Sequence, residues 1–263
     1  LQEFPVVCLP GAGILSDREF KLLRRFVEAG GKLLITGQVG QFDKHGGRLP
    51  DSKLADMSGA RAVGQTGAHD HWVSLGAADE AGHLAEGIRS DWPFLVKGPA
   101  TVYEPDTART VGTLFKPHRT TRQLQGKEGT EWPMSPDAPV GPAALVNQVG
   151  EGTVLTLSAS PDYATASEHH IVEARRLFAN AVRMLHPQPR LRISAPINVE
   201  AVTTEEPDTG TLRVHLLGYN APAQTTPAKN RPYALPALLE DPPMYRVTIE
   251  CDAPVRSVQA VGD

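Results

Sequence analysis

Acidic, amide and histidine side chains that follow predicted strands are the residues best suited to chemistry. Gln38 and Asp43 follow an apolar strand predicted at residues 32–36, and Asp162 follows another at 152–158. In open α/β sheets, ligands bind outside the carboxyl ends of the strands. We therefore expect these three side chains at a ligand edge.

Glycoside hydrolysis needs two carboxylates facing each other across a cleft. The spacing pairs none of the acids, so no catalytic residue is assigned.

The segment His69-Asp70-His71 is the best candidate for a metal or ligand site. Alternate residues of an extended segment point the same way, so both imidazoles could meet one ion. Solvated or hydrogen-bonded histidines are the commoner interpretation. We therefore predict no bound metal and no cofactor, and keep all three residues as ligand-edge candidates.

Two tryptophans, Trp72 and Trp132, could stack on a sugar ring, although packing in the core or in a loop is the commoner role of single tryptophans. Several catalytic motifs are absent from the sequence. There is no phosphate-binding glycine loop, no complete dinucleotide fingerprint after Gly11-Ala12-Gly13, and no strand-turn serine nucleophile motif. The sequence therefore does not indicate nucleotide or serine-hydrolase chemistry.

The composition is that of an ordinary globular protein. Of 263 residues, 40% are hydrophobic and 21% are charged, with a net charge of −4. This mild charge argues against a nucleic-acid or membrane-surface partner. No apolar stretch approaches the roughly 20 residues that cross a bilayer. Cys8 and Cys251 are predicted to be free, buried or half-buried thiols.

The secondary-structure pattern begins with a strand, a helix and a strand. Residues 5–9 form an apolar run that predicts a strand buried on both faces. Ser16 and Glu19 have the spacing of a capping box at the start of a helix that Gly30 and Gly31 end. With the strand at 32–36, these elements predict a right-handed βαβ unit. Residues 143–149 and 152–158 read as a hairpin, and 167–185 as a helix.

The pattern changes near residue 189. Beyond it, short segments alternate with a period of two and no helix intervenes, which predicts a small all-β sandwich interrupted by a Pro-rich stretch at 221–243. We therefore expect an α/β domain at 1–189, with an open, mostly parallel, flavodoxin-like sheet, and a β-sandwich module at 190–263. Because the chain opens at Leu1 almost directly into a strand, we expect it to be a piece of a longer polypeptide.

Several segments together resemble the class I glutamine amidotransferase-like domain found as the trimerisation domain of family 42 β-galactosidases and related glycoside hydrolases. The resemblance covers most of residues 4–220. It is carried by VVCLPGAGILSDREFKLLRRFVEAGGKLLITGQVGQFD, KLADMSGARA, ALVNQVGEGTVLTLSASPDYA, ARRLFANAVRMLHPQP, INVEAV and LRVHLLGYN.

The resemblance implies an accessory role. In that family the catalytic carboxylates lie on an upstream barrel domain, which would be a partner within the same polypeptide. In true amidotransferases a nucleophilic cysteine occupies a turn comparable to Ile35–Gln41, and this turn contains none. We therefore expect a non-catalytic region that either mediates assembly of a homo-oligomer or shapes a substrate cleft. We expect the parent protein to be secreted or periplasmic. A stand-alone hydrolase using the ligand-edge residues and a carbohydrate-binding module remain the alternatives.

Overall fold

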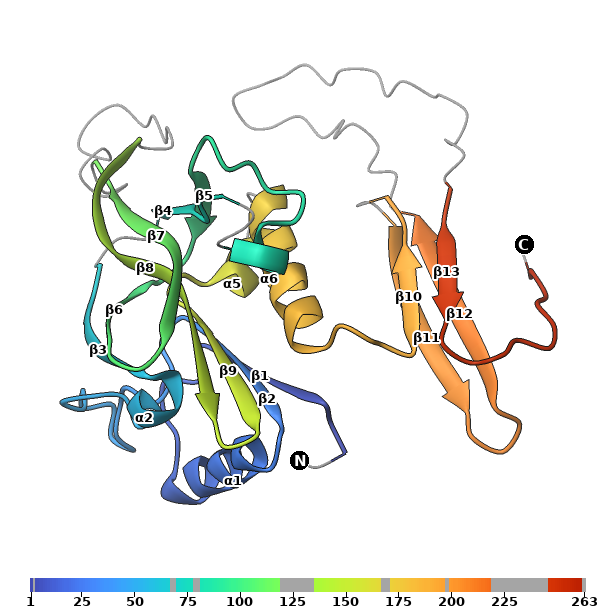
Figure 1. Cartoon of the computed structure of the whole chain (residues 1–263), viewed down its shortest axis with the longest axis horizontal. Coiled ribbons are helices and arrows are strands. Elements are labelled where there is room, and N and C mark those ends of the chain that lie inside the picture. The colour runs from blue at the N-terminus through green and yellow to red at the C-terminus, as the bar shows by residue number, and fades with distance from the viewer. Residues whose placement is uncertain are drawn as a thin grey trace, which may run out of the picture. The chain divides into compact units, whose positions relative to one another are not determined.

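The computed structural model describes residues 1, 3–66, 70–77, 81–118, 135–166, 171–196, 199–218 and 246–261, and of Ala166 only the backbone. The chain divides into two compact units, Leu1–Pro187 and Gln188–Asp263. Figure 1 shows the elements of both units. No helix in the described part of the chain is long and apolar enough to span a membrane.

A seven-stranded mixed sheet forms the centre of the first unit. Its order is β1 (Val6–Pro10), β2 (Lys32–Thr36), β9 (Gly152–Leu157), β8 (Pro136–Val149), β7 (Arg109–Pro117), β4 (Asp70–Ser74) and β5 (Phe94–Lys97). Figure 1 shows the long strands β7 and β8 curving together. A separate antiparallel pair joins β3 (Ala60–Gln65) to β6 (Thr101–Pro105).

The expectation of a mostly parallel sheet is wrong. Only the β1–β2 and β2–β9 pairings are parallel, whereas the other four pairings of the described sheet are antiparallel. A parallel neighbour requires a long crossover, while a tight turn reverses the chain. Gly150-Glu151 makes such a turn between β8 and β9, which confirms the predicted hairpin. Because of this turn, β8 and β9 pair antiparallel.

Helices cover the two faces of the sheet. On one face lies α1 (Asp17–Glu28), which buries Leu23, Phe26 and Val27, together with the short α2 (Ala55–Ser58). The predicted capping box of α1 is confirmed, because the Glu19 N–H donates to Ser16 Oγ and the Ser16 N–H donates to the Glu19 carboxylate. The 3₁₀ helix η1 (Gly82–Ala85), α5 (Pro161–Ala166) and α6 (Val172–Leu185) pack with the other face.

Strand β1 is an edge strand, and this corrects two expectations. Val6, Val7 and Leu9 are only half-buried and Cys8 is exposed, because β2 is the only described strand that pairs with β1. The run at residues 5–9 is therefore not buried on both faces. Cys251 is half-buried, and both cysteines are free.

The second unit consists of two antiparallel ribbons in its described part. β10 (Leu191–Ser194) pairs with β13 (Thr248–Cys251), and β11 (Val199–Glu206) pairs with β12 (Thr211–Gly218). Among its described side chains only Val199 is buried, with 9% of its surface exposed. The β-sandwich remains a prediction, and the Pro-rich stretch at 221–243 lies outside the described residues.

Candidate functional site

The carboxyl ends of the parallel strands form a closely packed edge. The Gly11 N–H donates to the Thr36 carbonyl oxygen at 3.0 Å, and the Gly40 N–H donates to the Ala12 carbonyl oxygen at 3.0 Å. Gly37 begins the loop after β2 with a φ of +65°, a conformation that favours glycine. A Cβ at this position would lie 2.5 Å from Ser160 Oγ. The Gly37 turn therefore has no space for a side chain.

Thr101, the first residue of β6, is hydrogen-bonded to this edge. Its buried hydroxyl donates to the Gly37 carbonyl oxygen at 3.1 Å and accepts from Gln41 Nε2 at 3.0 Å. The Thr101 N–H donates to the Ser158 carbonyl oxygen at 2.9 Å. Sequence reasoning missed this junction, because Gln41 and Thr101 lie far apart in the chain and no local pattern marks either one.

Asp162 is the predicted residue that the structure places most directly at the edge. It lies in the first turn of α5, and its Oδ1 atom is shielded from solvent without a hydrogen-bond partner among the described residues. The Cys8 side chain is close by. Its pKa is raised first by desolvation from neighbouring atoms, although the residue is largely exposed, and second by the Asp162 carboxylate. A thiol held in its protonated form is a poor nucleophile. Gln38 is half-buried next to Gly37.

Asp43 closes its own loop. Asp43 Oδ1 accepts hydrogen bonds from the backbone N–H groups of His45 at 2.8 Å and Gly47 at 2.9 Å. Such contacts are typical of an Asx turn, in which the side chain holds the backbone. This geometry supplies a structural role for a residue that the sequence placed among the ligand-edge candidates.

We expect Asp43→Ala to lower the free energy of unfolding by about 1 kcal/mol, because two backbone donors lose their acceptor. Asp43→Asn should cost less than half as much, since an amide oxygen can accept the same bonds. Chemical denaturation followed by tryptophan fluorescence measures both values. An Asn variant that is as unstable as the Ala variant would contradict the loop-closing role.

Strand β4 carries Asp70, His71 and Trp72. His71 is fully buried, and its Nε2 is hydrogen-bonded to Thr66 Oγ1. The Trp72 indole nitrogen is also shielded from solvent. Asp70 pairs in register with Lys97, the last residue of β5. A Cβ on the following residue, Gly98, would lie 2.7 Å from the Tyr163 ring of α5.

His69 and Trp132 lie outside the described residues, so the paired-histidine site and the Trp132 stacking site stay predictions. Within the described ranges, no group of three or more His, Cys, Asp or Glu side chains could hold a metal ion. The structure therefore places Asp70 beside the end of β5 and the residue after it, Gly98, against Tyr163 of α5. The grouping of Asp70 with the other ligand-edge candidates stays a prediction.

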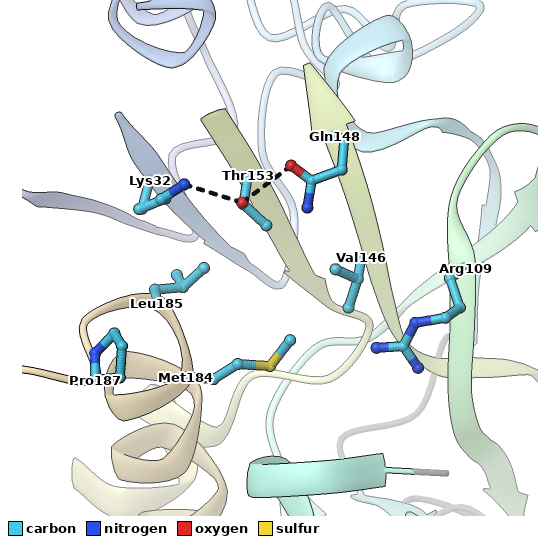
Figure 2. A pocket seen from close by; sticks show the side chains of 8 residues that line it. All are labelled: Lys32, Arg109, Val146, Gln148, Thr153, Met184, Leu185 and Pro187. Atoms are coloured by element: carbon cyan, nitrogen blue, oxygen red, sulfur yellow. Dashed lines mark hydrogen bonds between the residues drawn. The ribbon is translucent and has the colours of Figure 1, made fainter. Parts of the chain in front are cut away.

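A cavity of about 420 Å³ lies at the opposite, amino edge of β2 and β9, between the sheet and the end of α6 (Figure 2). Its lining residues are Lys32, Arg109, Val146, Gln148, Thr153, Met184, Leu185 and Pro187. Lys32 Nζ donates to Thr153 Oγ1 at 3.2 Å, and Thr153 Oγ1 donates to Gln148 Oε1 at 3.2 Å. Sequence reasoning selected none of these residues, because it looked for ligands at the carboxyl edge.

Comparison with solved structures relates the chain to parts of larger glycosidases. An α-L-fucosidase isoenzyme 2 from Paenibacillus thiaminolyticus matches with a TM-score of 0.62 and 20% identity, over 97% of this chain and 35% of that chain. A β-galactosidase from Rahnella sp. R3 matches with a TM-score of 0.58 and 17% identity, over 95% and 33%. A β-galactosidase from Bacillus circulans sp. alkalophilus matches with a TM-score of 0.54 and 18% identity, over 84% and 28%.

No family model and no curated protein matches the sequence. The chain spans about a third of the length of the solved chains it matches. Identities at this level establish a shared fold. The chain therefore has the fold of a segment of glycoside hydrolases.

Proposed function

We propose that this chain is a non-catalytic accessory region of a β-galactosidase-like glycoside hydrolase. In this proposal it has the class I amidotransferase-like fold of a trimerisation domain and serves subunit association or shapes the substrate cleft. The observation that carries the proposal is the coverage of the structural match. As much as 97% of the chain overlays on 35% of a glycosidase chain, so the shared region corresponds to one part of a larger enzyme.

The geometry at Gly37 supports the non-catalytic assignment. An amidotransferase nucleophile would require a side chain at a strand-turn of this kind. Gly37 has the left-handed backbone conformation of such a turn but no side chain, and Ser160 Oγ occupies the adjacent space. The exposed Cys8 lies within a strand, and its raised pKa disfavours the thiolate.

One edge of β1 pairs with no strand among the described residues, and this edge supports a role in association. Phe4 before the strand and Ile14 after it leave 60% and 53% of their surfaces exposed, and Cys8 between them is exposed as well. An unpaired strand edge with apolar flanking side chains is a surface that another chain or domain can cover. We name Phe4, Cys8 and Ile14 the β1 surface.

We expect the purified chain to associate reversibly at tens of micromolar concentration, and the double variant Phe4→Ser/Ile14→Ser to weaken this association at least tenfold. Light scattering coupled to gel filtration over a concentration series measures the change. Leu22→Ser is the matched control, because Leu22 on α1 is 45% exposed but lies outside the β1 surface. A strict monomer, or equal effects of both variants, would contradict the association role.

A further inference from the structure

We propose that two copies of this chain associate by antiparallel pairing of their β1 strands, about a twofold axis that passes beside Val7. The inference rests on the association role proposed above. It adds the partner, which is a second copy of the chain, and the geometry of the contact. Three features of β1 support it: the direction of its backbone groups, the absence of charge along it, and the position of a proline.

Every second residue of β1 turns its backbone polar groups away from β2. At one end of the strand, the Lys32 N–H donates to the Pro5 carbonyl oxygen at 3.3 Å. At the other end, the Gly11 N–H donates to the Thr36 carbonyl oxygen at 3.0 Å. Because every second residue of a strand bonds to the same parallel neighbour, the odd-numbered residues of this stretch face β2. The even-numbered residues therefore face the opposite, outer edge.

The outer edge of β1 presents backbone donors at two residues. Val6 and Cys8 direct both the N–H and the carbonyl group outward, whereas Pro10 directs only a carbonyl group because proline has no N–H. β2 is the only described strand that pairs with β1, and no described turn or loop bonds to the Val6 or Cys8 backbone. The outer edge can therefore accept a further strand.

The stretch around β1 carries no charge that would keep two copies apart. Residues 4–15 contain no acidic or basic side chain. Natural edge strands are commonly protected by charged residues, a bulge or a covering loop. The other edge strand of the sheet, β5, buries Phe94 and Val96 and ends in Lys97, whereas no residue of β1 is fully buried. A strand without charges brings no like charges together when it pairs with its own copy.

Pro10 determines the register of the pairing. With Val6 of one copy opposite Cys8 of the other, each outward N–H of these two residues meets an outward carbonyl oxygen, and Pro10 lies outside the paired positions. Centring the strands on Cys8 would instead set Val6 opposite Pro10, which has no donor for the Val6 carbonyl oxygen. The twofold axis therefore passes beside Val7, and both copies use the same surface.

Disulfide trapping measures this register directly. Two Val7 residues facing each other across the axis have Cα atoms about 4.5 Å apart, within the range of a disulfide. Val7→Cys in a Cys8→Ser/Cys251→Ser background should therefore form a covalent dimer when diamide takes up the thiol hydrogens. Leu9→Cys in the same background is the matched control, because Leu9 is half-buried on the same face as Val7 but lies about 14 Å from its copy. Non-reducing electrophoresis separates the products.

Cys8→Pro tests the backbone hydrogen bonds of the pairing. The Cys8 N–H faces outward, so a proline there removes a bond between the copies and none to β2. The twofold axis repeats this loss, so Cys8→Pro should weaken association about tenfold more than Cys8→Ser, which keeps the N–H. Light scattering over a concentration series measures both variants.

The outcomes separate this inference from the association role. A strict monomer would contradict both. Association without a Val7→Cys cross-link, or with equal cross-linking of Val7→Cys and Leu9→Cys, would overturn the β1 pairing and keep the association role. If Cys8→Pro folds poorly, the trapping experiment decides the register alone.

Discussion

Replacing Gly37 with cysteine is expected to destabilise the first unit by about 3 kcal/mol and to create no hydrolytic activity. The left-handed backbone at φ +65° costs a non-glycine residue about 1 kcal/mol. The new Cβ would also lie 2.5 Å from Ser160 Oγ, which donates to the Pro99 carbonyl oxygen at 2.7 Å. Moving Ser160 aside breaks this hydrogen bond and overpacks a buried region.

Denaturant unfolding followed by tryptophan fluorescence reports this change, because all three tryptophans precede residue 188. Gly46→Cys isolates the backbone contribution, since Gly46 has a φ of +82° and open space around its Cβ. It should cost only about 1 kcal/mol. Adding Ser160→Ala to Gly37→Cys should recover part of the loss. A Gly37→Cys variant as stable as the original chain would show that the turn can hold a nucleophile.

Gly152→Ala is expected to have the largest effect on stability, a loss of about 4 kcal/mol or more. Gly152 begins β9, directly beneath the end of α1, and a Cβ there would overlap the carbonyl oxygens of Val27 and Gly31. Because backbone atoms cannot rotate away as a side chain can, the β8–β9 hairpin must shift from the helix. That shift would also move Gln148 and Thr153, which line the cavity.

The same unfolding experiment measures this loss. Gly64→Ala is the matched control within a strand, because no atom lies within 4 Å of a Cβ built there. Its effect should stay within about 1 kcal/mol. A Gly152→Ala variant no less stable than Gly64→Ala would mean that the hairpin does not pack against α1 as described.

Local signals predicted the elements that local interactions determine. The Ser16–Glu19 capping box and the Gly150-Glu151 turn were predictable, because each depends on residues only a few positions apart. Whether neighbouring strands run parallel or antiparallel was not predictable in this way. An apolar run such as residues 152–157 looks the same in a parallel or an antiparallel sheet, and the edge position of β1 depends on the order of all seven strands.

The candidate sites depend even more on contacts between residues far apart in the chain, which local sequence patterns do not predict. Asp162 could be placed at a strand end from the sequence, but its proximity to Cys8 requires the β1–β2–β9 order. Thr101 contacts Gly37 from a segment with no catalytic motif. The Lys32–Arg109 cavity depends on the registers of three neighbouring strand pairs, none of which the sequence specifies alone.

Hydrolysis of aryl glycosides by the purified chain tests the central claim most directly. The assay compares aryl β-galactoside and aryl α-L-fucoside turnover with that of an Asp162→Asn variant and a buffer blank. The accessory role predicts no turnover above the blank with either substrate. Turnover that purifies with the chain and is lost in Asp162→Asn would contradict it, and would make the packed carboxyl edge an active site.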